Sequence, residues 1–93
     1  MSIGVCTIEI FIPDARSLKD KRRVLRSLLA RLRNRHNVAV AEVEHQDLWQ
    51  RARLAVVSVN TDHVRLESTL HSIEGEAASA RDIQLLDAHT EIL

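Results

Sequence analysis

Two kinds of hydrophobic repeat alternate along this 93-residue chain, and their order restricts the fold more than any other feature. Three segments are rich in β-branched residues and alternate in polarity, which predicts strands: residues 2–12, 37–45 and 53–60. Residues 18–35, and the stretch after Thr61 and Asp62, instead repeat their apolar residues every three or four positions, which predicts helices. Residues 81–93 supply a fourth strand, although their alternation is less regular.

The order strand–helix–strand–strand–helix–strand is that of the ferredoxin-like α/β sandwich, an α+β fold. Right-handed crossovers in such a chain place both helices on one face of a four-stranded antiparallel sheet. The sequence has no linker, low-complexity tract or repeat of fixed period. We therefore expect residues 1–93 to form a single domain.

The repeats also predict which side chains are buried. The first strand has one purely apolar face: Cys6, Ile8, Ile10 and Ile12. The second helix has one apolar stripe: Leu66, Leu70, Ile73 and Ala77. In the second strand the better core candidates are small or apolar: Ala39, Ala41 and Val43. This choice leaves Glu42 and Glu44 either for solubility on the uncovered face of the sheet or as countercharges for arginines. Cys6 is expected to be a small core residue rather than a nucleophile.

Charge is distributed very unevenly along the chain. Residues 16–35 hold nine of the thirteen Lys and Arg residues against one acid, Asp20, which gives this segment a net charge of +8. The rest of the chain holds four basic and twelve acidic residues, a net charge of −8. Because the total is zero, only this asymmetry offers an electrostatic attraction to a charged partner.

On a helix over residues 18–35 the leucines gather on one side, and the basic residues form a stripe about a quarter-turn away. The stripe and the basic residues near its start are Lys19, Arg23, Arg26 and Arg33, with Arg16 and Arg22. Such a stripe is either a solvated or internally paired face, or a surface that contacts phosphates. Asp20 falls on another face and is not expected to neutralise it. Lys21 falls among the leucines, and we expect its ammonium group to snorkel to the surface.

Few residue combinations indicate catalysis. Arg16 and Asn60 occupy places loosely comparable to the functional Arg and Asn of acylphosphatases, but the segment IPDARS lacks the glycines of a phosphate-binding loop. His63, Glu67 and His71 follow at i, i+4 and i+8, a spacing that can ligate a metal but is also common on solvated helices. We therefore predict no enzyme activity, no metal site and no cofactor.

Trp49 lies in the segment DLWQRA between the second and third strands. An indole in a loop either packs over its own domain or anchors a contact with a partner, because Trp is enriched in such contacts. The chain contains one Trp, one Phe and no Tyr, so few other aromatic side chains can fill the core. This scarcity favours packing within the same chain.

The single cysteine excludes an internal disulfide and favours a reducing compartment. No segment approaches the roughly 20 apolar residues of a membrane span, and the N-terminus has no signal-peptide pattern. We therefore expect a cytoplasmic protein that does not contact a membrane.

Three segments closely resemble the YlxP-like family of small bacterial proteins of unknown function: SLKDKR (17–22), NVAVAEV (37–43) and DLWQRA (47–52). The resemblance extends over nearly the whole chain. It implies a ferredoxin-like fold and a gene neighbourhood of translation-initiation and ribosome-maturation genes. It implies no catalytic residue and no ligand for this chain.

These observations predict a non-catalytic accessory protein that contacts structured RNA or a ribosomal particle through its basic helix. Contact with phosphates rather than bases means that sequence-specific DNA binding is not expected. The strands offer only Phe11 for the stacking of single-stranded bases. The alternative is a protein-interaction module or a homo-oligomer, because the sheet face without helices stays open to a partner.

Overall fold

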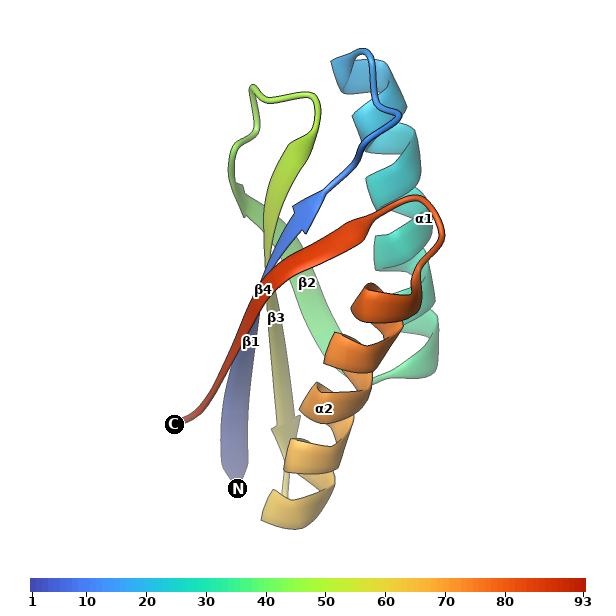
Figure 1. The fold of residues 1–93 in the computed structure, drawn as a ribbon. Coiled ribbons are helices and arrows are strands. Elements are labelled where there is room, and N and C mark those ends of the chain that lie inside the picture. Colours follow the sequence, from blue (N-terminus) through green and yellow to red (C-terminus); the bar gives the residue numbers. More distant parts are fainter.

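The computed structural model describes residues 1–93 and contains the six predicted elements in the predicted order (Figure 1). The elements are β1 (Ser2–Phe11), α1 (Leu18–Arg35), β2 (Val38–Glu44), β3 (Arg51–Asn60), α2 (His63–Ser79) and β4 (Gln84–Ile92). The strand order across the sheet is β2-β3-β1-β4, and every neighbouring pair is antiparallel. Both helices cover the same face of the sheet (Figure 1). The predicted ferredoxin-like fold is therefore confirmed.

The core lies between the helices and the covered face of the sheet. The apolar face predicted for β1 is confirmed, because Cys6, Ile8 and Ile10 are fully buried and Ile12 is 1% exposed. The predicted stripe on α2 is also buried: Leu66, Leu70, Ile73 and Ala77. Neither helix is long and apolar enough to cross a membrane.

Close packing of α2 on β1 depends on Gly4. A Cβ atom at this position would lie 2.5 Å from Cδ1 of Leu70, which is closer than two non-bonded carbon atoms approach each other. The absence of a side chain at Gly4 therefore lets the apolar stripe of α2 approach the centre of the sheet.

The prediction of which face of β2 is buried is wrong. Val40 is the buried residue of this strand, whereas Ala39 and Ala41 are exposed and Val43 is 44% exposed. Successive side chains of a strand point to opposite faces, so an error of one residue in phase exchanges the two faces completely. The pattern was misleading because Glu42, an acid, points to the covered face.

Lys21 of α1 explains why an acid belongs on that face. Its Nζ atom lies 2.7 Å from Oε2 of Glu42 and donates hydrogen bonds of 2.7 Å to the carbonyl oxygens of His45 and Leu48. The side chain is 1% exposed, and its ammonium group has two carbonyl acceptors and one carboxylate as ion-pair partner. The prediction that Lys21 snorkels to the surface is therefore wrong.

The hydrogen bonds of Lys21 also fix the loop between β2 and β3. His45 begins this loop in a left-handed backbone conformation, with φ of 67°, which His tolerates better than β-branched residues do. The Leu48 N–H donates to the His45 carbonyl at 3.0 Å, and the Ile12 N–H donates to the Gln50 carbonyl at 2.8 Å. The loop is thus attached both to α1 and to the segment that follows β1.

The S-x-x-D pattern of residues 17–20 predicts a capping box, and the N-terminus of α1 has a closely similar arrangement. The Asp20 N–H donates to Oγ of Ser17, the N-cap residue, at 3.0 Å. In return, Oδ2 of Asp20 accepts a 3.0 Å hydrogen bond from the Arg16 N–H. The Asp20 N–H, which the helix start leaves unpaired, is thereby satisfied, and the Asp20 side chain also holds the backbone of the residue before the cap.

Replacing Lys21 with Met should lower the free energy of unfolding by about 2–3 kcal/mol. Met keeps an apolar stem in the core, but Glu42 loses its ion-pair partner and the two loop carbonyls lose their donor. Because Glu42 is partly accessible to solvent, the loss of stability should be no larger than the smallest values seen when buried ion pairs are broken. Urea denaturation measures this change. Lys19→Met, an exposed lysine of the same helix without an ion pair, should change stability by less than about 0.5 kcal/mol. Equal stability of the two variants would contradict the role assigned to Lys21.

Candidate functional site

The exposed side of α1 gathers four cationic side chains around a shallow hollow of about 460 Å³. We call this surface the basic face; it consists of Lys19, Arg22, Arg23 and Arg26. Their spacing of three and four residues places them on one side of the helix. All four residues are exposed, and no acidic residue lines the hollow.

Only one member of the basic face has an acidic partner. Nη2 of Arg23 lies 3.5 Å from Oδ1 of Asp20, so Asp20 reaches one of these cations although the helical pattern places it on another face. The Arg23 side chain is nevertheless 79% exposed, and exposed ion pairs of this kind contribute little stability. The other three cations of the basic face form no ion pair and leave the surface strongly positive.

The remaining two residues of the predicted phosphate-contacting set lie apart from this group. Arg16 is exposed and precedes the N-cap of α1. Nη2 of Arg33 donates a 3.1 Å hydrogen bond to the carbonyl oxygen of Val40 in the edge strand β2. The Arg33 guanidinium is therefore turned toward its own sheet.

The C-terminal end of α1 is tied to α2 by a single acid. Glu76 pairs with Nη1 of Arg35 through Oε1 and with Nε2 of His36 through Oε2, both at 3.0 Å. Burial by itself would raise the pKa of Glu76, but the hydrogen bonds and charges of Arg35 and His36 outweigh burial and lower this pKa. Arg35 and His36 therefore stabilise the fold by joining the end of α1 to α2.

A second polar cluster, which the sequence analysis did not predict, lies on the uncovered face of the sheet. Its centre is Glu9 of β1, which is only 8% exposed. The Glu9 carboxylate lies 3.2 Å from Nε2 of His45, 3.2 Å from Nη2 of Arg53 and 3.6 Å from Nη2 of Arg51. Arg53 is the cross-strand neighbour of Glu9, and it also pairs with Glu44 at 3.0 Å.

The pKa of Glu9 reflects these neighbours. Burial by itself would raise it, but the hydrogen bond from His45 and the positive charges of His45, Arg53 and Arg51 outweigh burial. The pKa of Glu9 therefore lies below its ordinary value of 4.5, and the carboxylate is ionised at neutral pH.

Because the pKa of Glu9 is lower in the folded state, its ionised form stabilises the fold above the unfolded pKa near 4.5. This contribution is lost as the pH falls through the lower, folded-state pKa. Glu9→Gln should therefore be less stable than wild type at neutral pH and lose less stability on acidification to about pH 3. Urea unfolding across this range measures the difference, and exposed Glu91→Gln serves as control. Parallel pH profiles for Glu9→Gln and wild type would disprove this role of Glu9.

Trp49 is 54% exposed, so it is not a core residue, and its packing within its own chain is at most partial. The neighbouring Leu48 is 48% exposed. The loop does not need the indole to hold it, because Lys21 binds its backbone directly. A contact of Trp49 with a partner stays a prediction.

The other residues considered as possible catalytic or metal-binding groups do not come together in one site. Asn60 pairs with Ser2 at one end of β1, whereas Arg16 follows the opposite end, so these two residues do not form an acylphosphatase-like site. His63 and Glu67 form an ion pair of 2.7 Å, and the chain contains no cluster of three His, Cys, Asp or Glu residues suited to hold a metal ion. Cys6 is a core residue, as predicted, and burial raises the pKa of its thiol.

The fold and the basic face define a small ferredoxin-like α+β protein with one strongly cationic helix. The family described as "Protein of unknown function (DUF503)" matches residues 3–90, and the chain belongs to this family. The chain is 36% identical over 89 residues to "Uncharacterized protein YlxP" of Bacillus subtilis (strain 168). This match covers 96% of the chain and 97% of the relative, and it confirms the resemblance seen in the sequence.

Two solved structures are similar to this chain at low sequence identity. The first is a mutant of SnoaB, a cofactor-independent oxygenase from Streptomyces nogalater, with a TM-score of 0.53 and 13% identity; the match covers 99% of this chain and 90% of that one. The second is the C-terminal domain of a cyclometallase involved in the synthesis of the NPN cofactor of lactate racemase. Its TM-score is 0.43 at 12% identity, over 100% of this chain and 56% of that one. The likeness to SnoaB concerns the fold alone.

Proposed function

We propose that this protein is a non-catalytic accessory protein that contacts structured RNA or a ribosomal particle through the basic face of α1. The observation that supports the proposal is the gathering of Lys19, Arg22, Arg23 and Arg26 on one exposed side of a helix. Like charges at this spacing cost an isolated helix about 0.2–0.5 kcal/mol per pair. A bound polyanion removes this repulsion.

The character of the basic face favours phosphates over bases as its targets. Long cationic side chains on a single helix neutralise a phosphate backbone without reading base edges. No aromatic side chain lines the hollow between them. Binding should therefore depend little on sequence and strongly on salt. Release of counterions by four cations gives a log–log salt slope of about −3.

The double variant Arg23→Glu with Arg26→Glu should weaken binding to ribosomal RNA fragments at least about tenfold, because it replaces two attractive charges with two repulsive ones. Fluorescence anisotropy at two salt concentrations measures both the affinity and the salt slope. For the wild type, a fourfold rise in salt should weaken binding on the order of 50-fold, and the slope should be shallower in the variant.

A matched comparison separates the basic face from net charge. Arg26→Glu and Arg65→Glu change the total charge equally, but Arg65 is an exposed residue of α2 outside the basic face. Arg26→Glu should weaken RNA binding, and Arg65→Glu should leave it nearly unchanged. Equal losses, or no RNA binding by the wild type at low salt, would refute the proposal.

A second candidate function is self-association through the uncovered face of the sheet. Val57 and Val59 of β3 are 39% and 42% exposed on this face. Val57 lies in register with Val5 of β1 and Ala39 of β2, so the apolar surface spans three strands. Exposed apolar surface of this kind is typical of contacts between proteins, and two identical faces can pair about a two-fold axis.

Two variants separate the surfaces that self-association can use. If the valine-rich face forms the contact, Val57→Lys should dissociate the oligomer, because a charge would lie in an apolar interface. If the loop forms the contact, Trp49→Ala should dissociate it instead. Sedimentation equilibrium at high micromolar concentration measures the oligomeric state. A strictly monomeric wild type would exclude both surfaces.

A further inference from the structure

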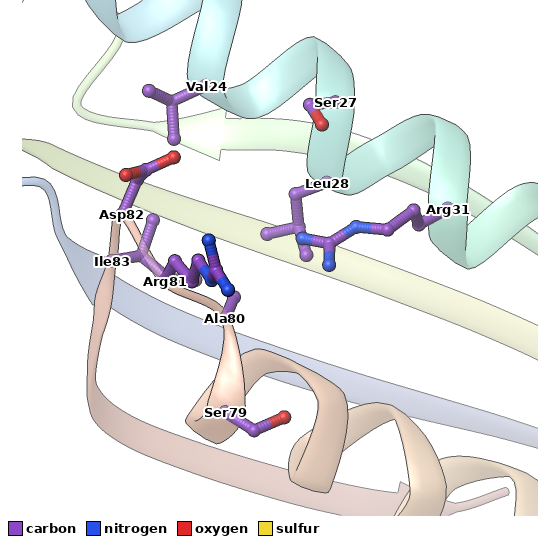
Figure 2. A pocket seen from close by; sticks show the side chains of 9 residues that line it. All are labelled: Val24, Ser27, Leu28, Arg31, Ser79, Ala80, Arg81, Asp82 and Ile83. Carbon is purple, nitrogen blue, oxygen red and sulfur yellow. The ribbon is translucent and has the colours of Figure 1, made fainter.

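A cleft separates α1 from the connection between α2 and β4 (Figure 2). The residues of α1 that line it differ from those of the basic face, so it lies on another side of the helix. The cleft exists because the backbone of α1 packs closest to β2, whereas α2 packs on β1, β3 and β4. Its volume is about 390 Å³, within the range of pockets that bind small molecules. Two of its lining residues, Leu28 and Ile83, belong to the buried core.

Two arginines enter this cleft from opposite walls. Arg31 comes from α1 and Arg81 from the connection after α2, and Figure 2 shows both guanidinium groups extending into the space between the walls. Neither guanidinium has a carboxylate partner within 4 Å, although most other arginines of the chain lie near an acid or a backbone carbonyl. Two facing positive charges without a counterion repel each other. An anion between them would turn this repulsion into attraction.

The other polar groups are arranged along the length of the cleft. Ser27 of α1 stands one helical turn before Arg31 and offers a hydroxyl. The carboxylate of Asp82 lies toward Val24, at the end away from Arg31 (Figure 2). One end of the cleft is therefore cationic and the other carries an acceptor, with apolar side chains between them.

We propose that this cleft binds a small phosphate monoester, with its phosphate between Arg31 and Arg81 and its organic part over Val24, Leu28 and Ile83. A phosphate monoester carries a charge of about −1.5 to −2 and three terminal oxygens. It therefore offsets both guanidinium charges and accepts more hydrogen bonds from them than a single carboxylate does. Asp82 accepts a hydrogen bond from a hydroxyl or amino group of the ligand and repels a second phosphate at that end.

Adenosine 5′-monophosphate, adenosine and inorganic phosphate are suitable probes, because they separate the phosphate from the organic part. The monophosphate should shift the backbone amide resonances of Arg31, Arg81 and Asp82 and bind at least tenfold more tightly than adenosine. Inorganic phosphate should shift the same amides at higher concentration. If neither phosphate-bearing probe shifts these resonances at millimolar concentration, the proposal is wrong.

Variants of the arginines test the geometry of the site. Arg31→Gln and Arg81→Gln should each weaken binding of the monophosphate at least tenfold, whereas Arg26→Gln, on the basic face, should change it less than twofold. Arg81→Lys should fall between, because lysine keeps the charge but not the planar pair of donors. Both arginines are exposed and without ion pairs, so the variants should fold normally, as unchanged amide spectra outside the cleft would verify. An equal loss in Arg26→Gln would overturn the proposal.

The cleft and the basic face can be tested independently. Arg81 lies outside α1, so Arg81→Gln should abolish most monophosphate binding and leave RNA binding unchanged. The double variant Arg23→Glu with Arg26→Glu should instead weaken RNA binding and leave monophosphate binding unchanged. If Arg81→Gln also weakens RNA binding to the same degree, the arginines of the cleft contact an RNA phosphate diester and the small-molecule assignment is wrong.

Discussion

The buried ammonium group of Lys21 is the constraint on which the arrangement of this protein depends. An unpaired charge in the core is strongly destabilising, so α1, β2 and the following loop must meet where the ammonium group gains two carbonyl acceptors and a carboxylate. Glu42 supplies the carboxylate, which fixes the phase of β2 against the helices. His45 and Leu48 supply carbonyl oxygens, which fix the loop and leave Trp49 exposed. One side chain thus sets the position of the helix, the face of a strand and the path of a loop.

The same constraint divides the basic residues of α1 into groups with different roles. With Lys21 and the leucines inside, Arg33 reaches the backbone of β2 and Arg35 reaches α2, where both support the fold. The basic face points to solvent, and Arg31 enters the cleft beside α2. The strongly positive segment is therefore not one uniform surface. Its outward cations are available to a polyanion, and Arg31 is available to a smaller anion.

The uncovered face of the sheet is divided in a similar way. At one end Glu9 is enclosed by the side chains of Arg51, Arg53 and His45, so their charges are largely satisfied within the chain. Toward the other end the row through Val57 is apolar and exposed. A partner that covers this face thus meets a charged half and an apolar half, which restricts the orientation in which it can bind.

The sequence by itself determined the order of the elements, the buried face of β1 and the cap at Ser17, because these depend on periods and contacts within a few residues. Only the tertiary structure decided the phase of β2 and the burial of Lys21. Both follow from an ion pair between a helix and a strand, and a hydropathy pattern counts each partner as a surface residue. The cluster at Glu9 could not be predicted from the sequence either, because Arg53 is 44 positions away and lies beside Glu9 only through the strand register. The position of a buried charged side chain depends on its ion-pair partner, and the tertiary fold determines which residue that partner is.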